Sequence, residues 1–375
     1  MAKTGRILHS TLSDDGTLTL SLDQVTLDPP GDDEVIVRIE AAPINPSDLG
    51  LMLGAADVGT MQVVGEGDDA SVSFRVPERR LSAMKARLGQ PMPVGNEGAG
   101  TVVACGRNVS HLDGKRVGAI GGGMYADYRK LAARDVVPLP DDASVRDGAA
   151  MFVNPLTALS FVETMRNEGH SAIVHTAAAS NLGQMLQKIC LADGVPLVNI
   201  VRSEQQAQIL RDIGATHVLN SKDEAFAEKL TQALHEAGAT IAFDAIGGGD
   251  LGDQILQAME RAAVRDAASF STYGSETFKQ LYIYGMLDNA PTVLNRSALG
   301  FSWSVSGWLL TPFLRKAGPE VAQRLRERIR SELTTTFASN YTRVIGLAEA
   351  LQPDVLRAYE RKATGEKFLI DPTAG

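Results

Sequence analysis

The sequence has little of what marks several classes of protein. It holds two cysteines, Cys105 and Cys190, far apart in the chain, which is typical of a reducing compartment, and we therefore expect a cytoplasmic protein. Basic residues are outnumbered, with 36 Lys and Arg against 45 Asp and Glu and a formal net charge of −9. Nucleic acids and anionic membranes are bound through basic surfaces, so neither is expected as the main partner.

Long apolar runs and metal-ligand patterns are also missing. The stretch from Leu299 to Leu310 is too short, and too often interrupted by polar residues, to span a bilayer. The first residues, Met-Ala-Lys-Thr-Gly-Arg, contain no apolar segment, so no targeting signal is expected. The six histidines do not have the spacing of metal ligands, and we interpret them as ordinary residues: His9, His111, His170, His175, His217 and His235.

The length predicts two domains, because 375 residues are too many for one compact core. Residues 1–153 contain short alternating segments such as Thr17 to Leu22 and Val35 to Glu40, separated by glycine and proline, which predict an irregular β-barrel. Between Ala55 and Gln90 we predict a long loop with a helical piece around Leu81 to Leu88. A solvated insertion is the favoured interpretation of this loop, and a functional loop is the alternative.

The segment from Ser171 to Ser203 has the pattern strand, tight turn, helix, strand. Ile173 and Val174 are apolar and β-branched, the turn after them consists of small residues, and Gly194 stops the helix. Such a unit places a helix N-terminus at the carboxyl end of a buried strand, where its N–H groups and dipole attract a pyrophosphate.

The turn keeps only part of the dinucleotide-binding fingerprint. Against G-x-G-x-x-G it offers Ala178, Ser180 and Gly183. Small residues here also suit the plain packing of a helix on a strand, so both interpretations stay open at this point.

The end of the second strand bears on the choice of cofactor. An acidic residue there would bind a ribose 2′-hydroxyl, but the chain has Val201, Arg202 and Ser203. An arginine and a hydroxyl suit a 2′-phosphate, which favours NADP(H) over NAD(H). Arg202 is alternatively a solvated charge, and Ser203 with Gln206 has the pattern of a capping box; the two interpretations are compatible.

Strands and helices then continue to alternate, which predicts a parallel sheet covered on both faces. We expect a helix over 204–213, a strand over 216–219, a capped helix opening at Ser221, and a strand from Thr240 to Asp244. The glycine run 247–249 either brings backbone close to a cofactor or forms a flexible turn.

Beyond Arg261 the pattern is weaker. We expect a strand from Ala262 to Ser271 with a turn after it, and a last buried strand within Ser297 to Leu310. Pro319 opens an amphipathic helix. The tail segment from Glu366 to Ile370 is too isolated to be a stable strand alone, so we expect it to rejoin the barrel.

Six short strings occur in an order that resembles the zinc-free medium-chain dehydrogenase/reductases, in their quinone oxidoreductase branch. They are Ala-Ala-Pro-Ile-Asn-Pro-Ser-Asp-Leu from position 41, Gly-Asn-Glu-Gly-Ala-Gly from 95, Gly-Lys-Arg-Val-Gly-Ala from 114, Asn-Pro-Leu-Thr-Ala-Leu from 154, Gly-Ala-Thr-His-Val-Leu-Asn from 214 and Phe-Asp-Ala-Ile-Gly-Gly-Gly from 243. The resemblance implies an α/β fold, with a Rossmann-type doubly wound parallel sheet in residues 154–330 and a GroES-like irregular β-barrel in residues 1–153 plus 331–375. It also implies a homodimer.

The resemblance also bears on metal content. Zinc-dependent relatives have a cysteine where this chain has Asn45 and a histidine where it has Asn96. Amides are poor zinc ligands compared with thiolate or imidazole, so we expect no catalytic zinc.

Carried over position by position, the resemblance implies a site for NADP(H). Asn45 would lie near the nicotinamide and the substrate oxygen. The residues implied to contact the cofactor are Asn45, the hinge residues Asn154 and Thr157, the pyrophosphate turn Ala178, Ala179, Ser180, Asn181, Leu182 and Gly183, the adenosine-phosphate residues Arg202 and Ser203 together with Asn220, and the nicotinamide edge Ile246, Gly247, Tyr273 and Gly274.

Three departures from the family pattern concern this site. Ser180 and Asn181 replace a glycine pair, and Ser221 stands where NADPH-binding relatives often have a tyrosine. Because Ser221 replaces that tyrosine, selectivity for the 2′-phosphate depends more on Arg202. A different tyrosine, which many relatives have just after the Asn-Pro segment, is missing as well.

Together these features predict hydride transfer from NADPH to a quinone or an activated alkene, without a metal. The Asn45 amide or an ordered water is expected to meet the developing oxyanion. Tyr125 is a candidate proton donor, although a half-buried aromatic is its favoured interpretation. Two alternatives stay open: an enone or enoyl-thioester reductase, and an NADPH-binding structural or sensing protein without turnover.

Overall fold

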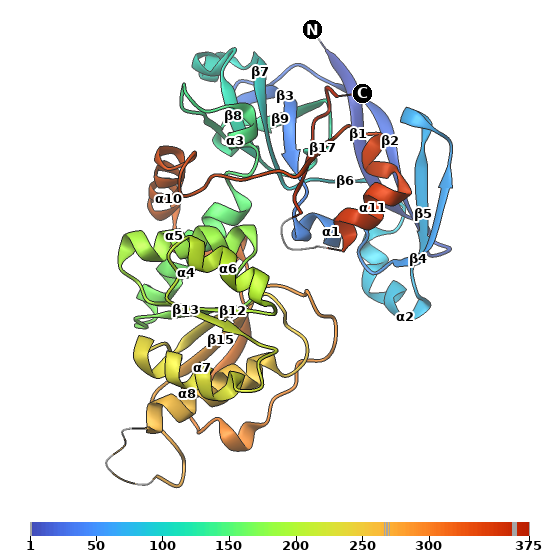
Figure 1. Cartoon of the computed structure of the whole chain (residues 1–375). Helices are drawn as coiled ribbons and strands as arrows, with labels where there is room; N and C mark the ends of the chain where they lie inside the picture. Colours follow the sequence, from blue (N-terminus) through green and yellow to red (C-terminus); the bar gives the residue numbers. More distant parts are fainter. Residues whose placement is uncertain (1, 266, 268, 270, 362–365, 375) are drawn as a thin grey trace. The chain divides into compact units, whose positions relative to one another are not determined.

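The computed structural model describes the chain except residues 1, 266, 268, 270, 362–365 and 375 (Figure 1). The chain divides into two compact units: unit 1 comprises residues 1–153 with 329–375, and unit 2 comprises residues 154–328. Each unit has a hydrophobic core of its own. None of the helices in the described residues is long and apolar enough to cross a bilayer.

Unit 1 is built from two β-sheets. The first is antiparallel, with the order β4-β5-β2-β1-β6, and its strands in chain order are β1 (Lys3–Leu12), β2 (Thr17–Leu27), β4 (Asp57–Val64), β5 (Ser71–Arg75) and β6 (Met92–Pro93). The second has the order β10-β8-β7-β3-β18-β17, with β9 also paired to β3; its strands are β3 (Glu34–Pro43), β7 (Glu97–Cys105), β8 (Arg116–Ile120), β9 (Tyr128–Ala132), β10 (Val136–Pro138), β17 (Arg343–Ile345) and β18 (Phe368–Ile370).

The short helices of unit 1 lie between these strands: α1 (Pro46–Met52), α2 (Glu78–Leu81), α3 (Val145–Gly148) and α11 (Pro353–Glu360). Side chains along each strand point alternately into the core of unit 1 and away from it. On β2, for example, Leu18 and Leu20 are fully buried while Thr17 and Thr19 are partly exposed.

The segment 55–90 is not the long loop that the sequence predicted. β4 and β5 pair with each other, and β5 pairs with β2, so the segment extends the first sheet by two strands. Val72 and Phe74 on β5 are buried, which anchors the segment despite its many charges. The expected helical piece is reduced to α2 and a 3₁₀ turn over Ser82–Arg87.

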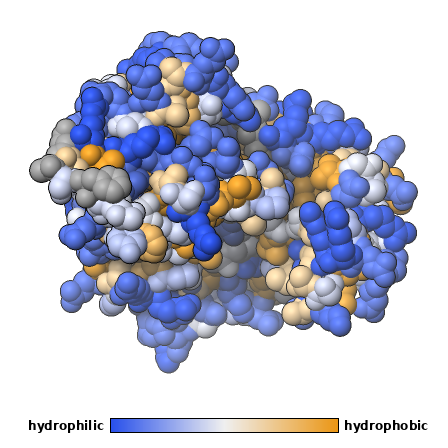
Figure 2. Space-filling view, turned by 90° about the horizontal axis from the view of Figure 1, so that it is seen from below, coloured by the Kyte–Doolittle hydropathy of each residue, from blue (hydrophilic) through white to orange (hydrophobic). Residues whose placement is uncertain are grey.

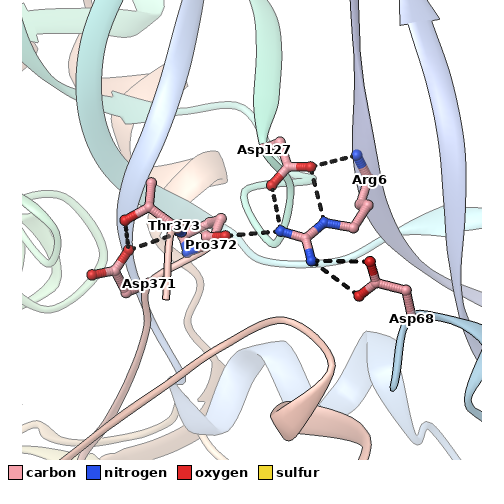
Figure 3. Close-up of polar contacts among 6 residues, drawn as sticks. All are labelled: Arg6, Asp68, Asp127, Asp371, Pro372 and Thr373. Carbon is pink, nitrogen blue, oxygen red and sulfur yellow. Dashed lines mark hydrogen bonds and ion pairs between the residues drawn. The ribbon is translucent and has the colours of Figure 1, made fainter. Parts of the chain in front are cut away.

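The tail rejoins unit 1, as the sequence predicted. β18 pairs antiparallel with β3, where Leu369 lies opposite Pro43. Figure 3 shows how Arg6 ties the tail to two other segments: its guanidinium donates to both carboxylate oxygens of Asp127 at 3.0 Å, to Asp68 at 3.0 Å, and to the carbonyl of Pro372 at 2.9 Å.

Unit 2 contains a six-stranded sheet in the order β13-β12-β11-β14-β15-β16, and every neighbouring pair is parallel. Its strands are β11 (Ile173–His175), β12 (Leu197–Val201), β13 (His217–Asn220), β14 (Ile241–Asp244), β15 (Lys279–Ile283) and β16 (Trp303–Gly307). This confirms the predicted doubly wound parallel sheet.

Helices cover both faces of this sheet. They are among α4 (Val153–Asn167), α5 (Asn181–Asp193), α6 (Glu204–Asp212), α7 (Phe226–Ala237) and α8 (Leu251–Val264). After β16 follow α9 (Leu310–Ala317) and α10 (Pro319–Ser331), and Arg324 and Arg328 of α10 form ion pairs with α4 and α5. Val174 belongs to the core that α7 and α8 fill, whereas Phe243 stacks on Phe161 of α4. Strand residues that point to opposite faces therefore pack under different helices.

Two elements of unit 2 differ from the sequence prediction. The helix expected to open at Ser221 begins at Phe226, because the Ser221 N–H still pairs with the carbonyl of Val201 and keeps the chain in the sheet. The strand expected over 262–271 is wrong at its start, since α8 continues to Val264; residues 266, 268 and 270 lie outside the described residues.

The molecular surface is mostly hydrophilic on the face that Figure 2 shows, with apolar side chains lying in small groups between charged ones. This agrees with the expected water-facing character of a chain that has 22% charged residues.

Candidate active site

The carboxyl ends of the unit 2 strands gather most of the residues that the resemblance implied. Parallel strands end at the same edge of a sheet, which is where such folds bind ligands. The residues that follow these strand ends are Ala178, Ala179, Ser180, Asn181, Leu182 and Gly183 after β11, Arg202 and Ser203 after β12, Asn220 at the end of β13, and Ile246 and Gly247 after β14. Asn154 and Thr157 lie in the first turns of α4.

The turn after β11 is held tightly against the start of α5. A Cβ atom on Gly183 would lie 2.1 Å from the Ala178 carbonyl oxygen, so this close approach requires glycine. Ser180 is the N-cap of α5, and its hydroxyl accepts a hydrogen bond from the Gly183 N–H at 3.2 Å. Ala178 and Ala179 are buried and put no large side chain beside the helix start, so the turn fits a pyrophosphate.

A buried carboxylate fixes the loop after β14 to the turn after β11. Asp244 accepts hydrogen bonds from the Thr176 hydroxyl at 2.6 Å, the Ile246 N–H at 2.9 Å and the Gly247 N–H at 3.0 Å. The Thr176 oxygen in turn accepts from the Ala245 N–H at 2.8 Å. Sequence reasoning singled out neither Thr176 nor Asp244. The signal for Asp244 was an acidic residue at a strand end, separated by two residues from a glycine run.

The corner formed by β12 and β13 carries two exposed cations. Val201 lies opposite Asn220 in the ladder, so the residues after each strand are neighbours. Arg202 and Lys222 are both exposed there, and Lys222 was missed by the sequence reasoning. Ser203 is the N-cap of α6, and its hydroxyl accepts from the Gln206 N–H at 3.3 Å, which is one of the two bonds of the predicted capping box. The Gln206 side-chain oxygen accepts from the Arg202 N–H at 3.0 Å.

Tyr273 and Gly274 do not lie at the ligand edge, and this prediction is wrong. Both precede β15, so they belong to its amino-terminal side, and Tyr273 is 69% exposed. The residues after β15 take their place: the Tyr284 N–H donates to the Asp244 carbonyl at 2.9 Å, and a Cβ on Gly285 would come within 2.5 Å of the carbonyl oxygen of Ala245. The alternating run Lys-Gln-Leu-Tyr-Ile from 279 carried this signal.

In unit 1, Asn45 is the centre of a buried polar network. It is 2% exposed and is the N-cap of α1. Its side-chain N–H donates to Glu97 at 2.8 Å, and its backbone N–H donates to Asp48 at 2.8 Å. The other carboxylate oxygen of Asp48 accepts from the Asn96 N–H at 2.8 Å, so the network joins the segments around 45 and 96.

Burial dominates the electrostatics of this network. It raises the pKa of Asp48 to about 7, against the lowering effect of its two backbone donors. Burial also raises the pKa of Glu97, while Lys367 and the N–H groups of Val153 and Phe152 act in the opposite direction. Burial lowers the pKa of Lys367 to about 8, although both carboxylates raise it.

Tyr125 is wholly buried, more deeply than the half-buried position that the sequence favoured. Its hydroxyl donates to the Pro43 carbonyl at 3.1 Å, and burial, together with Asp48, raises the pKa of the phenol well above its usual value. A Cβ on Gly95 would lie 2.6 Å from the ring, which explains why glycine is needed there. This arrangement favours a packing role for Tyr125 over proton donation.

Within the described part of the chain, no group of three or more His, Cys, Asp and Glu side chains is placed to hold a metal ion.

Comparison with known proteins gives the family. Residues 31–141 match the model of the alcohol dehydrogenase GroES-like domain, and residues 181–287 match that of zinc-binding dehydrogenases. A structure from Mesorhizobium loti, provisionally assigned as an NADPH:quinone reductase, has a TM-score of 0.73 at 27% identity and covers 98% of both chains. The chain belongs to the medium-chain dehydrogenase/reductases, of the quinone oxidoreductase type.

Two curated members of this family show the range of relatives. A mitochondrial enoyl-[acyl-carrier-protein] reductase from Xenopus tropicalis is 32% identical over 54% of this chain, and a protein from Leishmania amazonensis described as a probable quinone oxidoreductase is 28% identical over 60%. The matched regions span 52% and 64% of the lengths of these two relatives. As in other medium-chain dehydrogenase/reductases, the predicted Rossmann-type sheet and GroES-like domain are both present.

Proposed function

We propose that the protein binds NADP(H) and transfers hydride to a quinone or an activated alkene without a metal. The observation that carries this proposal is the edge of the unit 2 sheet, where the tight turn before α5 lies beside strands whose ends carry exposed cations. A helix start approached by small residues suits a pyrophosphate, and a guanidinium suits a 2′-phosphate. The name of the relative from Mesorhizobium loti, which includes NADPH, supports the same cofactor.

Specific residues are proposed to hold the cofactor. The turn from Ala178 to Gly183 would receive the pyrophosphate, and Arg202, Ser203 and Lys222 the adenosine phosphate. Backbone atoms would line the side of the site that receives the nicotinamide. The remaining contacts to the cofactor are proposed to come from Asn154, Thr157, Asn220, Ile246, Gly247, Tyr284 and Gly285. When bound, the reduced nicotinamide supplies the hydride, while the chain supplies position and charge complementarity.

We propose that the reaction needs no metal because the two residues of unit 1 at the zinc-ligand positions are amides. Asn45 and Asn96 stand where zinc-dependent relatives have a cysteine and a histidine, and an amide is a poor zinc ligand. The Asn45 amide is held by Glu97 through one N–H, which leaves its second N–H for the oxygen of an acceptor.

A quinone is the acceptor that the site favours. The Tyr125 hydroxyl is hydrogen-bonded inside the core, and the tyrosine that many relatives have after the Asn-Pro segment is missing. Few side chains are therefore positioned to donate a proton to the acceptor. A quinone tolerates few acids because its reduced anion is more stable than an enolate and depends less on a placed acid. The Xenopus tropicalis relative supports an enoyl-thioester or enone acceptor as the second candidate.

We also propose a homodimer in a reducing compartment. β16 is the last strand of the unit 2 sheet, so within the described residues its outer side is open to another strand. Large apolar residues on either side of it are exposed, with Phe301 at 80% and Leu309 at 65%. Both cysteines are free, which is consistent with a reducing environment.

The test combines binding with product formation. NADPH and NADH are titrated against the purified protein, and the NADPH-loaded protein is then offered matched quinone and enone acceptors with product identification. We expect tighter NADPH binding and faster quinone reduction. Binding of NADPH with no reduction of either acceptor would favour the alternative of a binding protein without turnover.

A further inference from the structure

A lysine of the tail lies beside Asn45. Lys367 directly precedes β18, in which Leu369 is opposite Pro43 on β3, and the Ile44 N–H donates to the carbonyl of the residue after Lys367 at 3.0 Å. Continuing this register by one pair places Lys367 opposite Asn45. Glu97 and Asp48, which both bind Asn45, also act electrostatically on Lys367, so its ammonium lies beside the Asn45 network.

The Lys367 nitrogen is buried and has no hydrogen-bond partner among the residues that the structure describes, although part of its stem is exposed. An ammonium carries three N–H donors, and burying them unpaired is costly. The groups that face it are Glu97 on β7, Asp48 on α1 and the ring of Tyr341, whose centroid is 5.3 Å from the nitrogen.

Both neighbouring carboxylates are already engaged by other donors. Glu97 accepts from the Asn45 amide and from the N–H groups of Phe152 and Val153 at 2.8 and 2.9 Å. Asp48 accepts from two backbone N–H groups. The ammonium therefore lies near two carboxylates, but no group in the described part of the chain accepts from its N–H donors, which can bind a group from outside.

We propose that Lys367 belongs to the acceptor site, where its ammonium binds the acceptor oxygen that becomes negative and gives that oxygen a proton. This proposal rests on the proposed reductase function. As the acceptor takes up hydride from the reduced nicotinamide, one N–H bond of Lys367 breaks and an O–H bond forms on the acceptor. The neutral amine that remains takes a proton from solvent, so charge and atoms balance.

The proposal has a pH signature. With a pKa of about 8, Lys367 is mainly the charged acid at pH 7 and mainly the neutral amine at pH 9. The rate should therefore fall as pH rises through about 8. Of the groups that face it, Asp48 has a pKa of about 7, on the acid side of this limb, and burial raises the pKa of Glu97 above its usual value. Burial keeps Tyr341 neutral by raising its pKa.

The experiment compares Lys367→Met with Lys115→Met, which changes an exposed lysine of the same unit. With a benzoquinone and NADPH, Lys367→Met should lower kcat/KM at pH 7 about 100-fold and remove the fall above pH 8, while the Kd of NADPH stays within about 2-fold. In a second readout, without turnover, the NADP⁺ complex is titrated with 4-nitrophenolate. Lys367→Met should weaken its binding about 10-fold, as expected for loss of one hydrogen bond between charged groups.

Several outcomes would overturn the proposal. A Lys367→Met protein that keeps both the phenolate affinity and the alkaline limb would show that Lys367 is only structural. If that variant does not fold, the Lys367→Arg protein and the pH–rate profile of the wild type provide the test. The Lys367→Arg protein should keep its phenolate affinity within about 3-fold but lose most of the rate of acceptor reduction, because a guanidinium does not release its proton. A wild type without an alkaline limb contradicts the proposal. A wild type that binds NADPH but reduces no acceptor would contradict the proposed function instead. The phenolate titration would then still test whether the Lys367 ammonium binds an anionic oxygen.

Discussion

Arg202 is the residue on which the proposed preference for NADP(H) depends, since it follows β12 with an exposed guanidinium. A hydrogen bond between charged groups contributes about 1.5–3 kcal/mol, so Arg202→Ala should weaken NADPH about 10- to 100-fold and NADH less than 2-fold in a fluorescence titration. Arg211→Ala is the control, because Arg211 lies on α6 and pairs with Glu204. Equal losses for both nucleotides would show that Arg202 is only a surface charge.

Gly183 is the residue that lets the turn approach α5. Because an added Cβ would lie 2.1 Å from a carbonyl oxygen of the backbone, Gly183→Ala should lower the free energy of unfolding by about 1–3 kcal/mol. Gly50→Ala is the matched control, since a Cβ there meets no atom within 4 Å. Urea unfolding measures both, and an unchanged midpoint for Gly183→Ala would refute the tight turn.

At the scale of elements, β18 is the tail strand that lies between β3 and β17 in the second sheet of unit 1. Leu369 is fully buried, so Leu369→Ala should cost about 2–5 kcal/mol of unfolding free energy. Val344→Ala on the neighbouring β17 changes a residue that is 37% exposed and should cost less than about 1 kcal/mol. Similar costs for the two substitutions in thermal or urea unfolding would contradict the buried position of the tail strand.

Elements with a clear period were predictable from the sequence, and the others were not. α5 ends at Gly194 with φ of 67°, as predicted, because glycine at a helix end has a local conformational signature. The strands β4 and β5 were missed because the charged residues between and after them led to a loop interpretation of the whole segment, although β5 itself alternates. The strand expected over 262–271 was an apolar run that belongs in part to α8, and a short apolar run does not by itself distinguish helix from strand.

The same distinction holds for the candidate site. The turn at Gly183 and the exposed Arg202 could be predicted, since each follows a recognisable strand. The roles of Asp244 and Lys367 could not, because they depend on which strands become neighbours in the sheet and in which register. Tyr273 was assigned to the ligand edge only because the strand before it was misplaced.

At the scale of the whole molecule, the proposed homodimer would use the open edge of β16. Phe301 is 80% exposed, so Phe301→Asp should leave the fold intact but shift the mass in solution from dimer to monomer by sedimentation velocity. Val64→Asp on β4 is the control, because this residue is 68% exposed on an edge strand of the other unit. A dimer that survives Phe301→Asp would place the interface elsewhere.

For the whole molecule, we propose that the chain reduces an organic acceptor with NADPH and needs no metal. The most direct test is a single turnover in a stopped-flow instrument, using chelator-treated protein whose zinc content has been measured, loaded with one equivalent of NADPH and mixed with a simple quinone. We expect the absorbance of the reduced nicotinamide to disappear completely and one equivalent of hydroquinone to form in protein free of zinc. Bound NADPH that persists at saturating quinone, or oxidation that appears only after zinc is added back, would contradict it.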